Sequence, residues 1–289
     1  MIIKLVIAAI VLFILGLCSI VIFNQTLLFT FLLIEYNNKT MHEPKTYPPA
    51  SMALYAKSFC KEVFYVLGKY YYLPFKYVNL QIKAPHNSDT AILLVHGYCR
   101  SQIDWLWLRK QLKSTNCNIF TLNLMPLLSS IEEITTQNLP AKIAQIKQQT
   151  NCKQIILIGH SMGGLVSSYY KEFLDHDKLI TAVITIGSPY HGTKISVAAA
   201  GINAQEMCPG SEFLARMRQQ IATHNQDYYQ ISSKFDNIVF PWNSALLETM
   251  PASRQMVLPF TTHLGLLHSP AVAAQLKQWI AEISERSPR

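Results

Sequence analysis

The hydrophobic positions near the start of this chain follow a pattern typical of a membrane segment. Residues 5–23 form an apolar run that only a few small residues interrupt. About 20 such residues span the hydrocarbon core of a bilayer as one helix. A second apolar run, 27–34, follows a short polar interruption and is too short to cross a membrane alone. The pattern predicts one transmembrane anchor within residues 1–36.

A cleaved signal peptide is the alternative interpretation of this run. The apolar stretch is long for a signal peptide, however, and no small-x-small cleavage site follows it. We therefore expect an uncleaved anchor. Lys4 precedes the run, whereas Lys39 and Lys45 follow it. These flanking charges lean weakly towards an N-terminus inside the cell, with the rest of the chain outside the cytoplasm.

The pattern changes in residues 37–75. Residues 37–50 contain three prolines and are expected to form a linker. Residues 51–75 are expected to form an amphipathic helix that packs on a globular core, although aromatics mixed with lysines also suit a membrane–water interface. The aromatic and basic residues of this segment and its end include Phe59, Phe64, Tyr65, Tyr70, Tyr71, Tyr72, Phe75, Lys57, Lys61, Lys69 and Lys76.

From residue 76 to residue 289, short apolar runs alternate with helix-compatible stretches. The expected strands are 76–83, 91–95, 119–124, 155–158, 182–186, 227–232 and 255–258. The expected helices are 104–112, 139–150, 162–174 and 270–283. The first strand is expected to be antiparallel, but strands alternating with helices predict a mostly parallel sheet with helices on both faces. Residues 190–225 break this alternation and are expected to form a helical insertion, either a lid or an ordinary excursion.

The amino-acid composition and net charge narrow the classes of molecule that this protein is expected to bind. Half of the 289 residues are hydrophobic, only 15% are charged, and the net charge is +8. The basic residues are scattered rather than clustered, so we expect no nucleic-acid partner. Attraction to anionic lipid surfaces and a basic surface without special use are both compatible with this charge. The six cysteines show no metal-like spacing, and no metal is expected.

A short glycine-rich motif carries the strongest chemical signal. Residues 159–163 read G-x-S-x-G, with Ser161 at the centre, between a strand-like run (155–158) and a helix-compatible run (164–169). This arrangement is typical of the nucleophile elbow of an α/β hydrolase, in which a tight turn presents the serine hydroxyl above the sheet. Larger side chains at the glycines would collide with neighbouring backbone. The alternative is a glycine-rich turn that only ends a strand.

A serine nucleophile needs a base and a carboxylate that orients the base. In this fold they follow the serine in the order acid, then histidine. Asp236 comes just after an expected strand, whereas Asp227 lies before that strand and Glu248 lies in a helix-like run. His263 comes directly after the last expected strand, and His268 falls near the start of the final helix. We therefore expect Asp236 and His263 to complete the triad.

The negative oxygen formed during acyl transfer needs two fixed hydrogen-bond donors. One is expected to be the backbone N–H of Met162, the residue after the nucleophile. The other is expected in the loop after the first long parallel strand, where the N–H of Tyr98 is the best candidate. His96, in the same loop, is expected to shape the turn by hydrogen bonding rather than to take part in the chemistry.

Six motifs, in chain order, resemble those of bacterial lipases, the triacylglycerol-lipase-like group of the α/β-hydrolase superfamily. They are VHG at 95–97, GHSMGG at 159–164, GSPYHGT at 187–193, PGSEFL at 209–214, DNIV at 236–239 and HLGLL at 263–267. The resemblance implies a triad of Ser161, Asp236 and His263, with Tyr98 and Met162 as oxyanion donors. The N-terminal membrane run departs from secreted lipases, and no acidic pair clearly marks the calcium site that some of them carry.

The sequence thus predicts an α/β-hydrolase domain at 76–289, joined by 37–75 to the anchor at 1–36. The expected activity is cofactor-free hydrolysis of carboxylic esters, most of all lipid acyl esters, through an acyl-enzyme. The expected location is a bacterial inner membrane, with the catalytic domain on its periplasmic side. Two alternatives remain: an acyltransferase with the same triad, and a non-catalytic α/β-hydrolase scaffold.

Overall fold

The computed structural model describes residues 2–42, 49–72, 78, 81–83, 88–223, 225–248 and 250–285. The chain separates into two compact units, residues 1–73 and 74–289. The division of the N-terminal part into an anchor, 1–36, and a linker with an aromatic segment, 37–75, stays a prediction.

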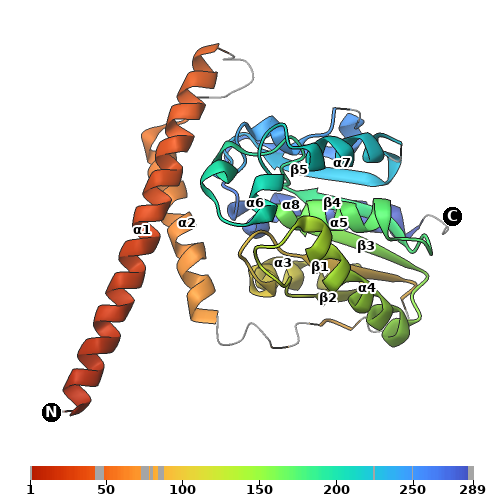
Figure 1. The fold of residues 1–289 in the computed structure, drawn as a ribbon, viewed down its shortest axis with the longest axis horizontal. Helices are drawn as coiled ribbons and strands as arrows, with labels where there is room; N and C mark the ends of the chain where they lie inside the picture. The colour runs from red at the N-terminus through yellow and green to blue at the C-terminus, as the bar shows by residue number, and fades with distance from the viewer. Residues whose placement is uncertain are drawn as a thin grey trace. The chain divides into compact units, whose positions relative to one another are not determined.

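Two helices make up the described part of the first unit. They are α1 (Ile2–His42) and α2 (Met52–Tyr72) (Figure 1). Residues 5–39 of α1 are long and apolar enough to cross a membrane, judged by length and composition alone. The helix runs on to residue 42, into the expected linker, and stops just before Pro44.

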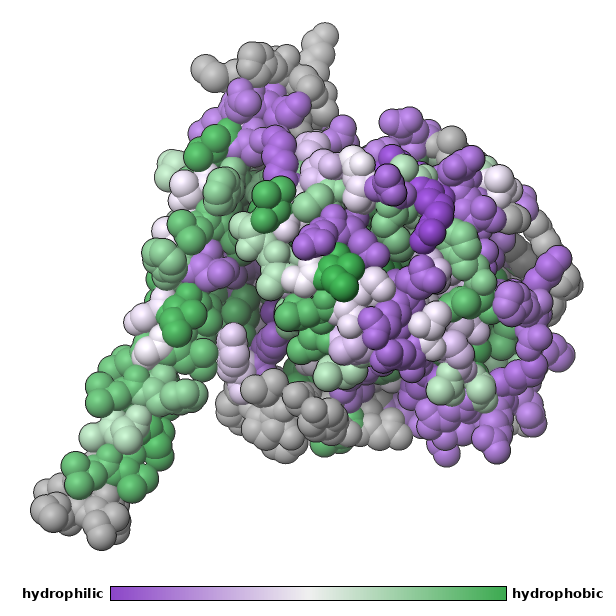
Figure 2. Space-filling model, in the orientation of Figure 1, coloured by the Kyte–Doolittle hydropathy of each residue, from purple (hydrophilic) through white to green (hydrophobic). Residues whose placement is uncertain are grey.

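Helix α2 packs along the C-terminal half of α1. The ring of Phe59 meets Phe29 edge-on at 5.4 Å between centroids, and Tyr55 meets Tyr36 in the same way at 6.1 Å. The N-terminal half of α1 has no such cover, and its apolar side chains are exposed, Phe13 to 73%. Figure 2 shows this hydrophobic surface in green along much of the helix. In water, an apolar surface of this extent indicates a membrane or partner contact.

The second unit is built on a six-stranded sheet whose strands are all parallel and run in the order β2-β1-β3-β4-β5-β6. The strands are β1 (Thr90–Val95), β2 (Asn118–Thr121), β3 (Gln154–His160), β4 (Ile180–Ile186), β5 (Tyr228–Ser233) and β6 (Gln255–Leu258). The predicted parallel sheet with helices on both faces is therefore confirmed. Because all strands point the same way, their C-terminal ends share one edge.

Helices cover the two faces of the sheet, and alternate strand residues supply the two cores (Figure 1). Leu93 belongs to the core shared with α4 (Ile131–Thr150), α5 (Met162–Phe173) and α7 (Glu212–Ala222). Leu94, its neighbour in β1, belongs to the core shared with α3 (Leu106–Gln111) and α8 (Pro270–Ser284). This follows from the two-residue period of a strand. Burial on both faces explains why the central strands are apolar throughout.

Short helices fill several connections. They are α6 (Ile202–Glu206), η2 (Gln102–Trp105), η3 (Leu112–Thr115), η4 (Lys194–Ala198), η5 (Asn225–Asp227), η6 (Trp242–Ala245), η7 (Ala252–Arg254) and η8 (Gly265–His268). The expected helix at 104–112 is thus split into η2 and α3. The expected insertion at 190–225 contains η4, α6 and α7, and η5 begins at its end.

Helix α4 begins at Ile131, eight residues before the predicted start at 139. The hydroxyl of Ser130 caps it by accepting the N–H of Glu133 at 3.1 Å. Pro140, the second residue of the predicted helix, lies inside α4 instead. The S-x-x-E spacing at 130–133 is the signal that would have located the true start.

Two strand predictions also need correction. Strand β2 ends at Thr121, three residues before the predicted end at 124. Of the expected antiparallel strand at 76–83, only 78 and 81–83 are among the described residues, and they contain a single antiparallel bridge from Ile82 to Ile119. The two residues exchange both backbone hydrogen bonds at 2.8 Å. The direction of the pairing was correct, whereas the rest of that strand falls outside the described residues.

Candidate active site

Ser161 lies at the turn between β3 and α5, at the C-terminal edge of the sheet. Its backbone angles, φ +57° and ψ −129°, belong neither to a helix nor to a strand. Such angles store strain and persist only where the surroundings enforce them. Here the N–H of Ser161 donates to the carbonyl of Ile186 at the end of β4, at 2.9 Å. The neighbouring strand therefore holds the serine in this conformation.

The glycines around Ser161 are required by close backbone contacts. A Cβ atom on Gly159 would lie 2.4 Å from the backbone of Gly164, and one on Gly163 would lie 2.2 Å from the carbonyl oxygen of Val95. Real Cβ atoms do not approach backbone so closely. The collision expected from the G-x-S-x-G pattern is therefore present on both sides of the serine, and helix α5 packs directly against β1 and β3.

Asp236 and His263 meet at the same edge. Asp236 lies three residues beyond β5, and its Oδ1 accepts the N–H groups of Ile238 and Val239, each at 2.8 Å. Its Oδ2 accepts from Nδ1 of His263 at 2.8 Å, and both side chains are buried. With the proton on Nδ1, the neutral imidazole keeps Nε2 as an acceptor. This is the tautomer that a general base needs.

Ser161 and His263 lie on either side of the end of β4. Ser161 is bonded to Ile186, and the imidazole of His263 lies beside Gly187, where an added Cβ would be 3.2 Å from its ring atoms. The ring of His160, which precedes the serine, is 4.5 Å from the ring of His263 between centroids. Among the hydrogen bonds of the described residues, none joins Ser161 Oγ to His263. Catalytic hydrogen bonds of free enzymes often tighten only when substrate binds.

The loop after β1 lies directly against the serine. A Cβ on Gly97 would be 2.9 Å from the Cβ of Ser161. The N–H of Tyr98 follows in this loop, and the N–H of Met162 is the first of α5, where helix N–H groups have no partner within the helix. Among the described residues, no acceptor is recorded for either N–H. The two predicted oxyanion donors thus belong to segments that flank Ser161.

His96 fixes the orientation of that loop. Its Nε2 accepts the N–H of Leu124 at 2.9 Å, so the proton of the neutral ring must be on Nδ1. Nδ1 then donates to the carbonyl oxygen of Gly97 at 2.9 Å. This carbonyl belongs to the same peptide group as the N–H of Tyr98, and in a trans peptide the two point in opposite directions. His96 therefore fixes where the Tyr98 N–H points, together with the N–H of Arg100, which donates to the same carbonyl oxygen at 3.2 Å.

The alternative candidates for the acid and the base lie away from this arrangement. Asp227 precedes β5, at the opposite edge of the sheet, and pairs with Lys171 at 3.1 Å. Glu248 is exposed. His268 lies in η8, where its Nδ1 bonds the carbonyl of Leu264 at 3.1 Å. Of the two late histidines, His263 is the one that the structure joins to Asp236.

The insertion at 190–225 is packed at two places. Helix α7 buries Leu214 and Met217 in the core beneath α5. Helix α6 lies against the loop after β2, where Asn203 donates to the carbonyl of Leu127 at 2.8 Å. The hydroxyl of Tyr98 donates to the carbonyl of Ala200 at 2.7 Å. The insertion is thus attached to the loop that carries a predicted oxyanion donor.

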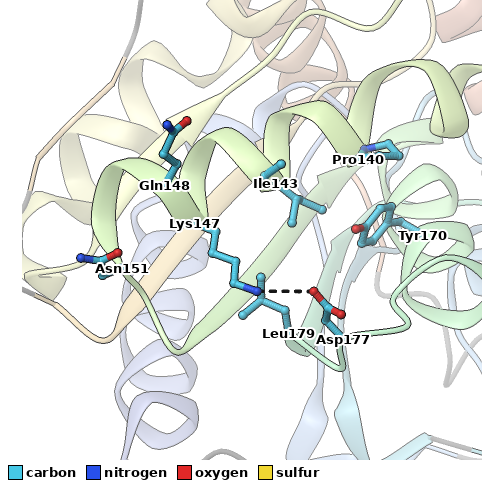
Figure 3. Close-up of a pocket in the computed structure, with 9 residues that line it drawn as sticks. Pro140, Ile143, Lys147, Gln148, Asn151, Tyr170, Asp177 and Leu179 are labelled. Atoms are coloured by element: carbon cyan, nitrogen blue, oxygen red, sulfur yellow. Dashed lines mark hydrogen bonds and ion pairs between the residues drawn. The ribbon is translucent and has the colours of Figure 1, made fainter.

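A separate pocket of about 510 Å³ lies between α4, the end of α5 and the turn before β4 (Figure 3). Asn151 precedes β3 and Leu179 precedes β4, so the pocket is at the N-terminal edge of the sheet, opposite Ser161. The Lys147–Asp177 ion pair, 3.4 Å long, crosses it. The pocket has no part in the candidate active site.

Comparison with known proteins agrees with the fold. A family model for the α/β hydrolase fold matches residues 90–222. Triacylglycerol lipases of Pseudarthrobacter phenanthrenivorans and Burkholderia plantarii are each 29% identical over 112 residues, which are 36% of this chain and 34% and 31% of theirs. The mature lipase BlEst2 of Bacillus licheniformis is 16% identical with a TM-score of 0.55, and the match covers 70% of this chain and 94% of that one.

The second unit therefore has the α/β-hydrolase fold. The chain is similar in sequence to triacylglycerol lipases over about a third of their length. The matched family region includes Tyr98, Ser161 and Met162 but ends before Asp236 and His263. The assignment of the acid and the base rests on their hydrogen bond and their place at the sheet edge.

The pH dependence of stability is expected to report the buried imidazole of His160. Burial, and next the nearby His263, lower its pKa well below the usual value. Below about pH 6.5 the unfolded chain binds a proton at this residue that the folded chain does not bind. The free energy of unfolding should therefore fall with falling pH, by up to about 1.4 kcal/mol per pH unit from this group.

Denaturant unfolding of the detergent-solubilised chain between pH 5 and 7.5 measures this slope. The variant His160→Gln should show a shallower slope because the glutamine does not titrate. Replacement of the exposed His176 by glutamine is the matched control and should leave the slope unchanged. Equal slopes in wild type and His160→Gln would contradict the expectation.

Proposed function

We propose that this protein is a membrane-anchored serine hydrolase that cleaves carboxylic esters of lipids. The observation that carries the proposal is the 2.8 Å hydrogen bond from His263 Nδ1 to Asp236, formed beside the strained Ser161 turn. The fold and the similarity to triacylglycerol lipases support ester hydrolysis as the reaction class.

In the proposed mechanism, Nε2 of His263 takes the proton of Ser161 as Oγ attacks the ester carbonyl. Asp236 holds the imidazole in the required tautomer and stabilises its cationic form. The N–H groups of Tyr98 and Met162 stabilise the oxyanion. His263 then gives the proton to the departing alcohol, and a water molecule releases the acyl group from Ser161 by the same steps.

A rim of exposed apolar side chains supports a lipid substrate. Met125, Leu127 and Leu128 in the loop after β2, and Val197 and Ile202 in the insertion, are 41–76% exposed. The two segments are joined, because the N–H of Ile202 donates to the carbonyl of Leu128 at 2.9 Å. The insertion also contacts the oxyanion loop. The rim is thus on loops that border the candidate site, and apolar patches of this kind mark lipid or protein contacts.

Helix α1 is the proposed anchor. Its apolar length, residues 5–39, exceeds the roughly 20 residues that a bilayer core requires. The flanking charges favour a catalytic unit outside the cytoplasm, on the periplasmic side of a bacterial inner membrane. An anchored hydrolase would meet esters that are already within or at the membrane.

The first test compares turnover of a soluble p-nitrophenyl ester by triad variants. Ser161→Ala and His263→Gln should each lower kcat by about 10⁶, because the triad acts as a unit, and Asp236→Asn should cost less, about 10⁴. His268→Gln is the control for the base and should retain activity within severalfold. Full activity in His263→Gln, or loss confined to His268→Gln, would refute the assignment.

The rim is tested with a paired substitution, Val197→Ser with Ile202→Ser. Turnover of a long-chain ester presented in vesicles should fall about tenfold or more, whereas turnover of a short soluble ester should stay near the wild-type rate. Val257→Thr, on the exposed edge strand β6, is the control and should affect neither substrate. Equal losses on both substrates would show that the rim does not serve lipid binding.

The anchor is tested by membrane fractionation with carbonate extraction. The full chain should stay in the membrane pellet, and a variant without residues 1–36 should be released. A full chain that is soluble without detergent would contradict the anchor. Recovery of a shortened, soluble mature form would instead indicate a cleaved signal peptide.

A further inference from the structure

The backbone of His263 is held from two sides by buried side chains outside the proposed triad. On one side, Nε2 of His160 donates to the carbonyl oxygen of His263 at 3.1 Å. On the other, the N–H of His263 donates to Oδ1 of Asn237 at 2.9 Å. His160 and Asn237 are at most 1% exposed. Both contacts are therefore shielded from competing water.

The tautomer of His160 follows from its contacts. A carbonyl can only accept, so the proton lies on Nε2. Nδ1 of His160 is buried and has no hydrogen-bond partner among the described residues. A proton on Nδ1 would thus be a buried donor without an acceptor, which is costly. His160 is a neutral imidazole with one fixed role, as the donor to the His263 carbonyl.

Each of the two contacts comes from a neighbour in sequence of another triad residue. His160 directly precedes Ser161 at the end of β3, and Asn237 directly follows Asp236 after β5. Residues 259–264 form neither a helix nor a strand, so no ladder of backbone hydrogen bonds fixes this loop. The contacts attach the loop to the two segments whose side chains the base must meet.

The two contacts constrain the backbone of His263, which the side-chain bond to Asp236 does not fix. The N–H and the C=O of His263 belong to the two peptide groups on either side of its Cα, so holding both restricts φ and ψ of that residue. The bond from Nδ1 to Asp236 fixes one edge of the ring but not the position of the Cα behind it. The Asp236 bond fixes the edge of the ring, and the two backbone contacts fix the Cα. These three contacts together determine the direction of Nε2.

We propose that His160 and Asn237 are positioning residues that together aim the imidazole of His263 at Ser161. This inference rests on the proposed function, because it assigns to His263 the role of base. It predicts that loss of either contact affects the rate of the chemical step and not the binding of substrate, because neither residue is proposed to touch the ester. Misplacement of a catalytic group by about 1 Å can cost about 10²-fold in rate.

The surroundings of His160 are suited to this role. Burial lowers the pKa of its ring, and the nearby His263, Arg100 and His268 also oppose a positive charge there. Arg100 is paired with Asp104 through two hydrogen bonds, at 2.6 and 2.8 Å. A neutral His160 adds no charge beside the imidazolium that His263 becomes during the reaction. The ring of Trp105 packs edge-on against His160 at 6.5 Å and restrains its orientation.

An isosteric pair of substitutions isolates the His160 contact. In His160→Gln the side-chain amide nitrogen is placed to donate in place of Nε2, whereas His160→Met has similar length and no donor. With a soluble p-nitrophenyl ester and the full chain in detergent, His160→Gln should keep kcat within about fivefold of wild type. His160→Met should lower kcat by about 10- to 100-fold with KM unchanged.

Substitution of Asn237 gives a second, independent test of the proposal. Asn237→Leu removes the acceptor for the His263 N–H and should also lower kcat without changing KM. Because both contacts act through one residue, the double variant His160→Met with Asn237→Leu should lose less than the product of the single losses. His268→Gln, which alters a neighbouring histidine that also bonds a carbonyl of this loop, is the matched control and should change kcat by less than fivefold.

Several results would overturn the proposal. They are a folded His160→Met with wild-type kcat, a His160→Gln no better than His160→Met, or losses that appear in KM alone. If thermal melting shows that neither His160 variant folds, the kcat and KM of Asn237→Leu decide whether the proposal holds. Labelling of wild type and Ser161→Ala with a fluorophosphonate separates this outcome from failure of the proposed function. Equal labelling of the two proteins would refute the nucleophile itself, whereas selective loss in Ser161→Ala leaves only the positioning role in question.

Discussion

The hydrogen bond between His263 and Asp236 is the interaction on which the account of this protein depends. It joins two residues 27 positions apart in the chain, and it exists because β5 and β6 are parallel and end at one edge of the sheet. The same edge carries Ser161 at the end of β3. A parallel sheet with two buried faces thus does more than form a core: it brings the ends of distant segments to one place, where a hydroxyl, an imidazole and a carboxylate can act together.

Local constraints turn this shared edge into a defined geometry. The Ser161 turn is kept in strained angles by its bond to Ile186 and by close contacts that only glycine tolerates. His96 orients the peptide group of Tyr98 through the Gly97 carbonyl. His96 and, in the same way, His160 are therefore single tautomers that bond carbonyl oxygens, and they order the loops around the serine. In both cases a histidine near a reactive group has a structural role that its residue type alone does not reveal.

Much of this could be predicted from the sequence because the signals are local. The strand before Ser161, the elbow and the order of acid and base all follow from apolar runs, glycines and chain order. The start of α4 was missed because the S-x-x-E cap at 130–133 was not used to locate it. The contacts of His160 and Asn237 with His263 could not be foreseen, since they depend on how loops of distant strands meet. Their only sequence signal is their position beside Ser161 and Asp236.

The proposed anchor and the apolar rim give the proposed chemistry a setting, but the reactivity of Ser161 is the central claim. Its most direct test is mass spectrometry of the protein after reaction with a fluorophosphonate, followed by digestion and mapping of the modified peptide. The account predicts one adduct, on Ser161, that forms far more slowly when His263 is replaced by glutamine. Absence of an adduct from the folded protein, or an adduct on a different residue, would contradict it.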